Sequence, residues 1–145
     1  MAEAELYRER LDEAMANNPG KPRPVFAMMR HTAVYDSAAD SMVPVRAVQA
    51  VLSQFENLYK NLGDVQNGFP ASIELKELEN REEYNPAMLQ ENLMFGTPDE
   101  VIAKLRMYEA LGVDQFTYYA SMGLGRREQK RSLDLFINEV MPAFA

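Results

Sequence analysis

Residues 93–101, which read LMFGTPDEV, decide the fold class because they place an apolar run directly before a helix start. The run that ends at the glycine predicts a short buried strand. Thr97 can cap the following helix, Pro98 suits its first position, and Glu100 completes a capping box. The helix is expected to end at Gly112. This stretch therefore predicts one β/α unit.

Two further β/α units are expected on either side of it. Residues 25–35 are mostly apolar and are preceded by prolines, which predicts a strand buried on both faces. Residues 38–62 predict an amphipathic helix. Residues 113–120 predict a third strand, and residues 126–141 predict the last helix. A first helix is expected over residues 3–15. Such alternation implies parallel strands that are joined by right-handed crossovers.

Residues 1–145 are expected to form a single α/β domain. A closed eight-stranded β/α barrel needs about 250 residues, so three units correspond to a partial barrel. Residues 63–92 are turn-rich and then charged, which predicts an insertion or lid with Phe69 and Tyr84 as covering aromatics. Three parallel strands alone leave edges uncovered, so either a homo-oligomer or a missing N-terminal half is expected.

The composition limits the classes of partner. The chain has 145 residues, 47% of them hydrophobic, a formal net charge of −7 and no cysteine. An acidic surface repels phosphate backbones, so nucleic acid is not an expected partner. The absence of a signal peptide and of a long apolar run predicts a cytoplasmic protein without a membrane partner. The charged run 74–83 has no histidine nearby, so no metal site is expected.

Several motifs occur in a fixed order along the chain. They are FGTPDEV at 95–101, ALGVDQF at 110–116, and RSLDLF at 131–136 followed by VMP at 140–142. In this order and spacing they resemble the C-terminal part of the bacterial luciferase-like family of flavin-dependent monooxygenases. Residues 23–36 also resemble the sixth strand of that family, including a histidine within it.

The resemblance implies a (β/α)8 barrel that uses reduced flavin and oxygen to oxidise a small organic substrate. FMN is the expected cofactor, and some relatives use a deazaflavin instead. This chain would be the C-terminal part of such an enzyme and incomplete by itself. The first alternative is a non-catalytic half-barrel subunit or dimerisation module that does not bind flavin alone. The second is a small α/β binding protein unrelated to flavin.

Four residues are candidates for the site that the resemblance implies. His31, the only histidine, is the catalytic candidate because the family often has a histidine here near the flavin, where it can donate a hydrogen bond or move a proton. Arg30 could hold a flavin or substrate anion, or it could pair with a helix carboxylate. Strand alternation sends the two side chains to opposite sides. A hydrogen-bonded structural histidine is the alternative for His31.

Tyr118 and Tyr119 lie near the carboxyl end of the last predicted strand, where β/α proteins build their sites. Both are candidates for cofactor binding. Adjacent strand residues point opposite ways, so at most one of them should face a pocket, while the other packs under helices. The glycine-containing turn 121–125 leads into a helix that begins with Arg126 and Arg127, which allows anion binding; the alternative is an ordinary turn with solvated arginines.

Overall fold

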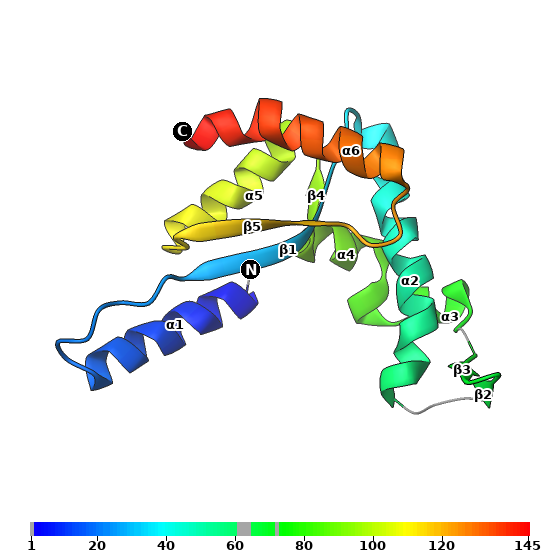
Figure 1. Ribbon diagram of the computed structural model, residues 1–145, viewed down its shortest axis with the longest axis horizontal. Helices are drawn as coiled ribbons and strands as arrows, with labels where there is room; N and C mark the ends of the chain where they lie inside the picture. Colours follow the sequence, from blue (N-terminus) through cyan, green and yellow to red (C-terminus); the bar gives the residue numbers. More distant parts are fainter. Residues whose placement is uncertain (1, 61–64, 72) are drawn as a thin grey trace.

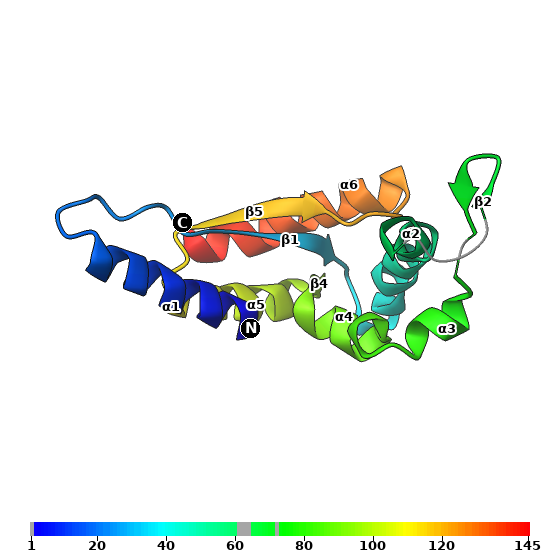
Figure 2. The same ribbon diagram turned by 90° about the horizontal axis from the view of Figure 1, so that it is seen from below.

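The computed structural model of the protein describes residues 2–60, 65–71 and 73–145. Its centre is a three-stranded parallel sheet made of β1 (Ala27–Val34), β4 (Met94–Gly96) and β5 (Gln115–Ala120). Helices follow each strand, so the chain is a mixed α/β protein, and the predicted alternation of strands and helices is confirmed. Figures 1 and 2 show α1 (Ala2–Asn17) beside β1.

The strand order is β4-β1-β5, so the first strand lies in the centre of the sheet. Thr32 of β1 is opposite both Met94 of β4 and Ala120 of β5. Consecutive strands of a β/α barrel are neighbours, which would place β4 in the middle. The order observed is that of an open sheet in which β4 and β5, the second and third strands of this sheet along the chain, lie on opposite sides of β1. The parallel β/α units are therefore confirmed, whereas their order differs from that of three consecutive barrel strands.

The two faces of the sheet bury different sets of side chains. Val34 belongs to a cluster with residues of α5 (Pro98–Ala110), α6 (Arg126–Leu135) and η3 (Phe136–Val140), the π-helical continuation of α6. Its neighbour Ala33 packs with Val45 and Val48 of α2 (Met42–Lys60) and with Phe95. Because side chains alternate along a strand, α2 lies on the face opposite to α5 and α6.

The face that carries Ala33 is covered only near the carboxyl ends of the strands. Figures 1 and 2 show that α2 lies at that end of the sheet and that α3 lies beyond α2. Nearer the start of β1, Met29 is 56% exposed, and Tyr119 of β5, which lies opposite His31, is 41% exposed. The prediction that this strand is buried on both faces is therefore wrong for its first half, because α2 does not reach that far.

The long connection between β1 and β4 contains several short elements besides α2. The turn at Asn67 and Gly68 has positive φ at both residues and joins two very short antiparallel strands. The sequence predicts turns in this stretch but not the hairpin. The connection consists of η1 (Ala38–Asp40), α2, β2 (Val65–Gln66), β3 (Phe69–Pro70), α3 (Leu75–Glu79), η2 (Glu82–Tyr84) and α4 (Pro86–Asn92).

The predicted helix start after β4 is confirmed in detail. Thr97 caps α5, and the Glu100 carboxylate accepts a hydrogen bond from the Thr97 backbone N–H at 2.8 Å. The ammonium group of Lys104 donates to the carbonyl oxygens of Leu93 and Phe95, each at 2.9 Å. The ammonium group of Lys104 thus links α5 to the backbone at the start and the middle of β4. Burial lowers the pKa of Lys104.

Candidate functional site

The topology of the sheet points to one place for a site. In open α/β sheets, ligands bind in the crevice outside the carboxyl ends of the strands, at the point where the strand order reverses. Here the chain leaves β1 toward α2 on one face, and it leaves β5 toward α6 on the other. The two helices diverge, so the crevice is expected between the ends of β1 and β5.

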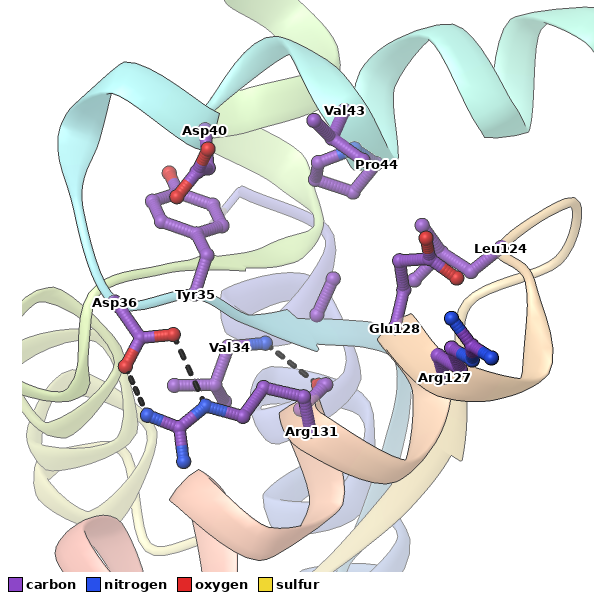
Figure 3. A pocket seen from close by; sticks show the side chains of 12 residues that line it. Val34, Tyr35, Asp36, Asp40, Val43, Pro44, Leu124, Arg127, Glu128 and Arg131 are labelled. Carbon is purple, nitrogen blue, oxygen red and sulfur yellow. Dashed lines mark hydrogen bonds and ion pairs between the residues drawn. The ribbon is translucent and has the colours of Figure 1, made fainter.

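A cavity of about 400 Å³ occupies this position. This volume is within the range of small-molecule sites. Figure 3 shows Tyr35, Asp36 and Asp40 on one side of it, and Leu124, Arg127 and Glu128 on the opposite side. Its apolar surface comes from Ala33, Val34, Val43, Pro44 and Leu124. We call this cavity the switch-point crevice.

The crevice is bridged by one internal ion pair. Arg131 of α6 binds both carboxylate oxygens of Asp36, with its Nε at 3.0 Å from Oδ2 (Figure 3). Hydrogen bonding to Arg131 lowers the pKa of Asp36. Both side chains are more than half exposed, so solvent screens the pair, and we assign it an orienting role more than a stabilising one.

Other charged groups around the crevice have no partner within the part of the chain that the structure describes. Arg127, Asp40 and Glu128 line the cavity, and their side chains take part in none of the ion pairs or hydrogen bonds between described residues. Tyr35 also lines it, and burial together with the nearby charge of Glu100 raises the pKa of this phenol. The crevice therefore combines apolar walls with charges that are free to meet a ligand.

The two walls of the crevice meet at Gly123. This residue has φ of +80°, and a Cβ placed on it would lie 2.2 Å from the carbonyl oxygen of Ala47 in α2. Only glycine accepts both this conformation and this distance without strain. The loop after β5 is thus held directly against the backbone of α2.

A second, smaller hollow lies on the uncovered part of the sheet and holds two of the residues predicted from sequence. His31 and Tyr119 are register partners on β1 and β5, with ring centroids 4.7 Å apart. The hollow measures about 280 Å³ and is also lined by Met29, Arg30 and Leu93. The Nδ1 atom of His31 is buried and has no hydrogen-bond partner among the described residues. Burial lowers the pKa of His31.

Arg30 lies at the edge of the same hollow, but its guanidinium is already engaged. Nη2 is 2.9 Å from the Glu3 carboxylate of α1, and Nη1 donates to the Met29 carbonyl at 3.0 Å. This ion pair is the pairing with a helix carboxylate that was predicted for Arg30 as the alternative to anion binding. A role for Arg30 in holding a cofactor stays a prediction, and it would require this ion pair to be exchanged for another.

Tyr118 points to the other side of the sheet. Its hydroxyl lies 2.8 Å from Ser132 Oγ, and its ring packs edge-on against Phe136 at 5.0 Å. Ser132 Oγ also accepts a hydrogen bond from the Val34 backbone N–H at 2.7 Å. The structure therefore brings His31 and Tyr119 together, while Tyr118 is the register partner of Arg30, which lines the edge of the hollow. A cofactor role for Tyr118 remains an untested prediction.

The crevice residues Tyr35, Asp36, Asp40 and Arg131 were not proposed from the sequence. A signal was present, because Tyr35 and Asp36 directly follow an apolar strand and the carboxyl end of a parallel strand is where sites form. Arg131 could not be found in this way, since only the packing of α6 brings it to Asp36. Arg127 was identified as part of a possible anion site, and it does line the crevice.

Among residues 2–60, 65–71 and 73–145, no group of three or more acidic or histidine side chains could hold a metal ion. No helix in the same ranges is long and apolar enough to cross a membrane.

The geometry defines an α/β protein with a ligand-sized crevice at the switch point of an open sheet. Over 123 residues, or 85% of its length, the chain is 33% identical to the oxygenase component of the flavin-dependent trigonelline monooxygenase of Acinetobacter baylyi. The chain spans 34% of the length of that relative. The similarity supports a relationship to flavin-dependent monooxygenases. No protein-family model and no solved structure matches the chain.

Proposed function

We propose that this chain is part of the oxygenase component of a flavin-dependent monooxygenase that acts on a small organic substrate. The supporting observation is the 33% identity over 123 residues with a protein of that name. Since the chain spans 34% of that relative, the activity of the whole oxygenase is proposed for a longer assembly to which this chain contributes. The luciferase-like family and FMN in preference to a deazaflavin are proposed on the motifs described above, and self-association is proposed on the uncovered strand edges. A cytoplasmic location stays a prediction.

We place the ring system of the proposed flavin in the hollow around His31. Tyr119 offers an exposed aromatic surface, Met29 offers an exposed apolar side chain, and the orphaned Nδ1 of His31 offers one hydrogen-bonding atom. Flat aromatic ligands combine such surfaces with a few placed polar groups. A bound reduced flavin would supply the electrons with which oxygen is activated.

His31 would hold and move a proton at this surface. Because burial lowers its pKa, the imidazole is neutral at pH 7 and can either accept a proton at one ring nitrogen or donate from the other. The Tyr119 ring at 4.7 Å limits the positions that the imidazole can take. Packing of this kind keeps a proton-transferring group in one orientation.

Titration of the purified chain with oxidised and reduced FMN, followed by flavin fluorescence, tests this proposal. Saturable binding that weakens at least about tenfold in His31→Ala or Tyr119→Ala is expected, since such contacts contribute on the order of 1–2 kcal/mol. Thr117→Ala is the matched control, because Thr117 is exposed and lies on the same strand face as Tyr119. No binding by a folded chain would contradict the proposal for this chain alone and favour the non-catalytic subunit.

Activity measurements in a full-length oxygenase that contains this segment test the role of His31 itself. Replacing His31 by Ala should lower turnover by roughly 10²–10⁴-fold, which is the usual contribution of proton transfer, and should hardly change the free energy of unfolding. Equal losses of stability and activity would show that the residue is structural.

A further inference from the structure

A further cavity lies at the amino end of β5, where it is enclosed by α5, η3 and η4 (Met141–Phe144). It measures about 600 Å³, which is within the range of small-molecule sites. Figures 1 and 2 show the C-terminus beside the start of β5. We propose that this cavity, which we call the aromatic pocket, binds an uncharged aromatic molecule that carries one hydrogen-bonding group. This role needs no flavin and goes beyond the proposed monooxygenase function.

The aromatic pocket is separate from both sites described above. Tyr118 lines the pocket and its neighbour Tyr119 lines the hollow around His31, so the two sites lie on opposite faces of the sheet. The switch-point crevice lies outside the carboxyl ends of β1 and β5, whereas the pocket is lined by Val113 and Gln115 at the start of β5. A ligand of the pocket would therefore bind without contacting the proposed flavin.

Aromatic rings form a large part of the lining, and the core holds several of them in place. Phe136 is only 8% exposed, and its ring lies 6.2 Å from that of Phe116 and 5.0 Å, edge-on, from that of Tyr118. A ligand ring at such distances adds stacked or edge-to-face contacts to those of simple burial. The aromatic residues that line the pocket are Tyr108, Phe116, Tyr118, Phe136 and Phe144.

The charged side chains of the pocket are already paired within the chain. The Glu109 carboxylate accepts a hydrogen bond from Arg106 Nη1 at 2.6 Å. The Asp114 carboxylate accepts from Arg23 Nη1 at 2.5 Å and from the Phe26 backbone N–H at 2.8 Å. An anionic ligand would meet these two carboxylates, and a cationic ligand would have to displace an arginine from one of them. The pocket therefore favours a ligand without charge.

One polar group of the pocket is left for the ligand. Tyr108 is 6% exposed, and its hydroxyl takes part in none of the hydrogen bonds between described residues. The oxygen is not among the side-chain atoms that are sealed from solvent, so a ligand can reach it. The Tyr118 hydroxyl, in contrast, is bonded to Ser132 Oγ. Since buried polar groups are normally hydrogen-bonded, the Tyr108 hydroxyl is the group that would bond to the polar group of the ligand.

Three matched naphthalene derivatives test the proposal on the full chain without flavin. The chain has no tryptophan, so the naphthyl fluorescence can be followed directly. The probes are 2-naphthol, which is uncharged and carries one hydroxyl, 2-naphthoate, which carries a negative charge, and 2-methylnaphthalene, which carries no polar group. 2-Naphthol should bind in a one-to-one complex and at least about tenfold more tightly than 2-naphthoate, because the pocket would desolvate the carboxylate without pairing it. Equal affinity for these two probes, or no binding of 2-naphthol, would overturn the proposal.

Single substitutions identify the site. Tyr108→Phe should weaken 2-naphthol binding about three- to tenfold and leave 2-methylnaphthalene binding unchanged, because it removes only the hydroxyl. Phe144→Leu should weaken the binding of both probes about threefold, because it removes one ring of the lining. Tyr7→Phe and Phe55→Leu are the matched controls, since both residues are exposed and neither lines the pocket.

The position of the bound probe and the occupancy of the pocket complete the test. Amide chemical-shift changes on addition of 2-naphthol should centre on Val113 and Phe144, and the affinity should not depend on the concentration of the chain. Changes centred on His31, or an unchanged 2-naphthol affinity in Tyr108→Phe, would overturn the proposal. Release of 2-naphthol as the chain concentration rises would also overturn it, since a second copy of the chain would then fill the pocket.

Discussion

Tyr118 and Tyr119 are neighbours in the sequence, yet they lie in opposite environments. Tyr118 is packed under α6, with its hydroxyl and the Val34 N–H both bonded to Ser132 Oγ. Tyr119 is 41% exposed, and its ring lies tilted against that of His31, whose Nδ1 is buried without a partner among the described residues. On one face of the sheet the polar groups complete the packing, and on the other they remain available for a ligand.

The largest expected difference in stability between the two faces comes from the two consecutive methionines of β1. Met28 is 4% exposed and belongs to the core, whereas Met29 is 56% exposed. Met28→Lys should lower the free energy of unfolding by about 4 kcal/mol or more, because it buries an unpaired charge. Met29→Lys should change it by less than about 0.5 kcal/mol. Urea denaturation measures both, and a large loss in Met29→Lys would mean that another chain covers this face.

Truncation of the two tyrosines should give the next largest difference. Tyr118→Ala removes a ring that packs on Phe136 and should cost about 3 kcal/mol. Tyr119→Ala should cost less than about 1 kcal/mol, because the ring is partly in water already. Similar losses for the two variants in denaturant melts would remove the distinction between the faces.

Ser132→Ala sharpens the comparison on the packed side alone. It leaves the Val34 N–H and the Tyr118 hydroxyl without their partner, which should cost roughly 1–3 kcal/mol. Amide exchange at Val34 should accelerate in the variant. Ser121 is the control position, since its hydroxyl is buried without a partner among the described residues, so Ser121→Ala should be neutral or stabilising.

The smallest expected effect is the pH dependence of folding stability that His31 adds on the exposed face of the sheet. Burial lowers its pKa, so in mildly acidic solution the unfolded chain binds a proton that the folded chain does not. The stability that neutral His31 contributes to the folded chain is therefore fully present above the ordinary histidine pKa of 6.5, and it is lost as the pH falls below that value. The imidazole signals of this single histidine should titrate below that value, and His31→Gln should remove this part of the pH dependence. A midpoint above 6.5 would contradict the burial of the ring.

Local features of this fold could be predicted, and long-range pairing could not. The capping box of α5 and the opposite directions of Tyr118 and Tyr119 follow from local rules, and both are confirmed. The position of β1 between β4 and β5 has no local signature, because all three segments have apolar runs that would suit either neighbour. The crevice was missed for the same reason, since its walls meet only once that order is known.

That residues 63–92 form an insertion or lid stays a prediction. Their Tyr84 lies against α2, where its carbonyl accepts a hydrogen bond from Gln49 Nε2 at 2.9 Å. Gly63, which directly follows the helix expected over residues 38–62, lies outside the described residues. The side chain of Phe69 also lies outside them.

The contact between Gly123 and the Ala47 carbonyl has a mechanical consequence. Since no side chain intervenes there, the backbone of α2 and the loop that leads into α6 can move only together. The width of the crevice is then fixed before any molecule enters it. Ligands of the crevice should therefore be discriminated by size, and replacing Gly123 by a larger residue, which would push the loop away from Ala47, should widen the range of sizes accepted while it weakens the binding of each.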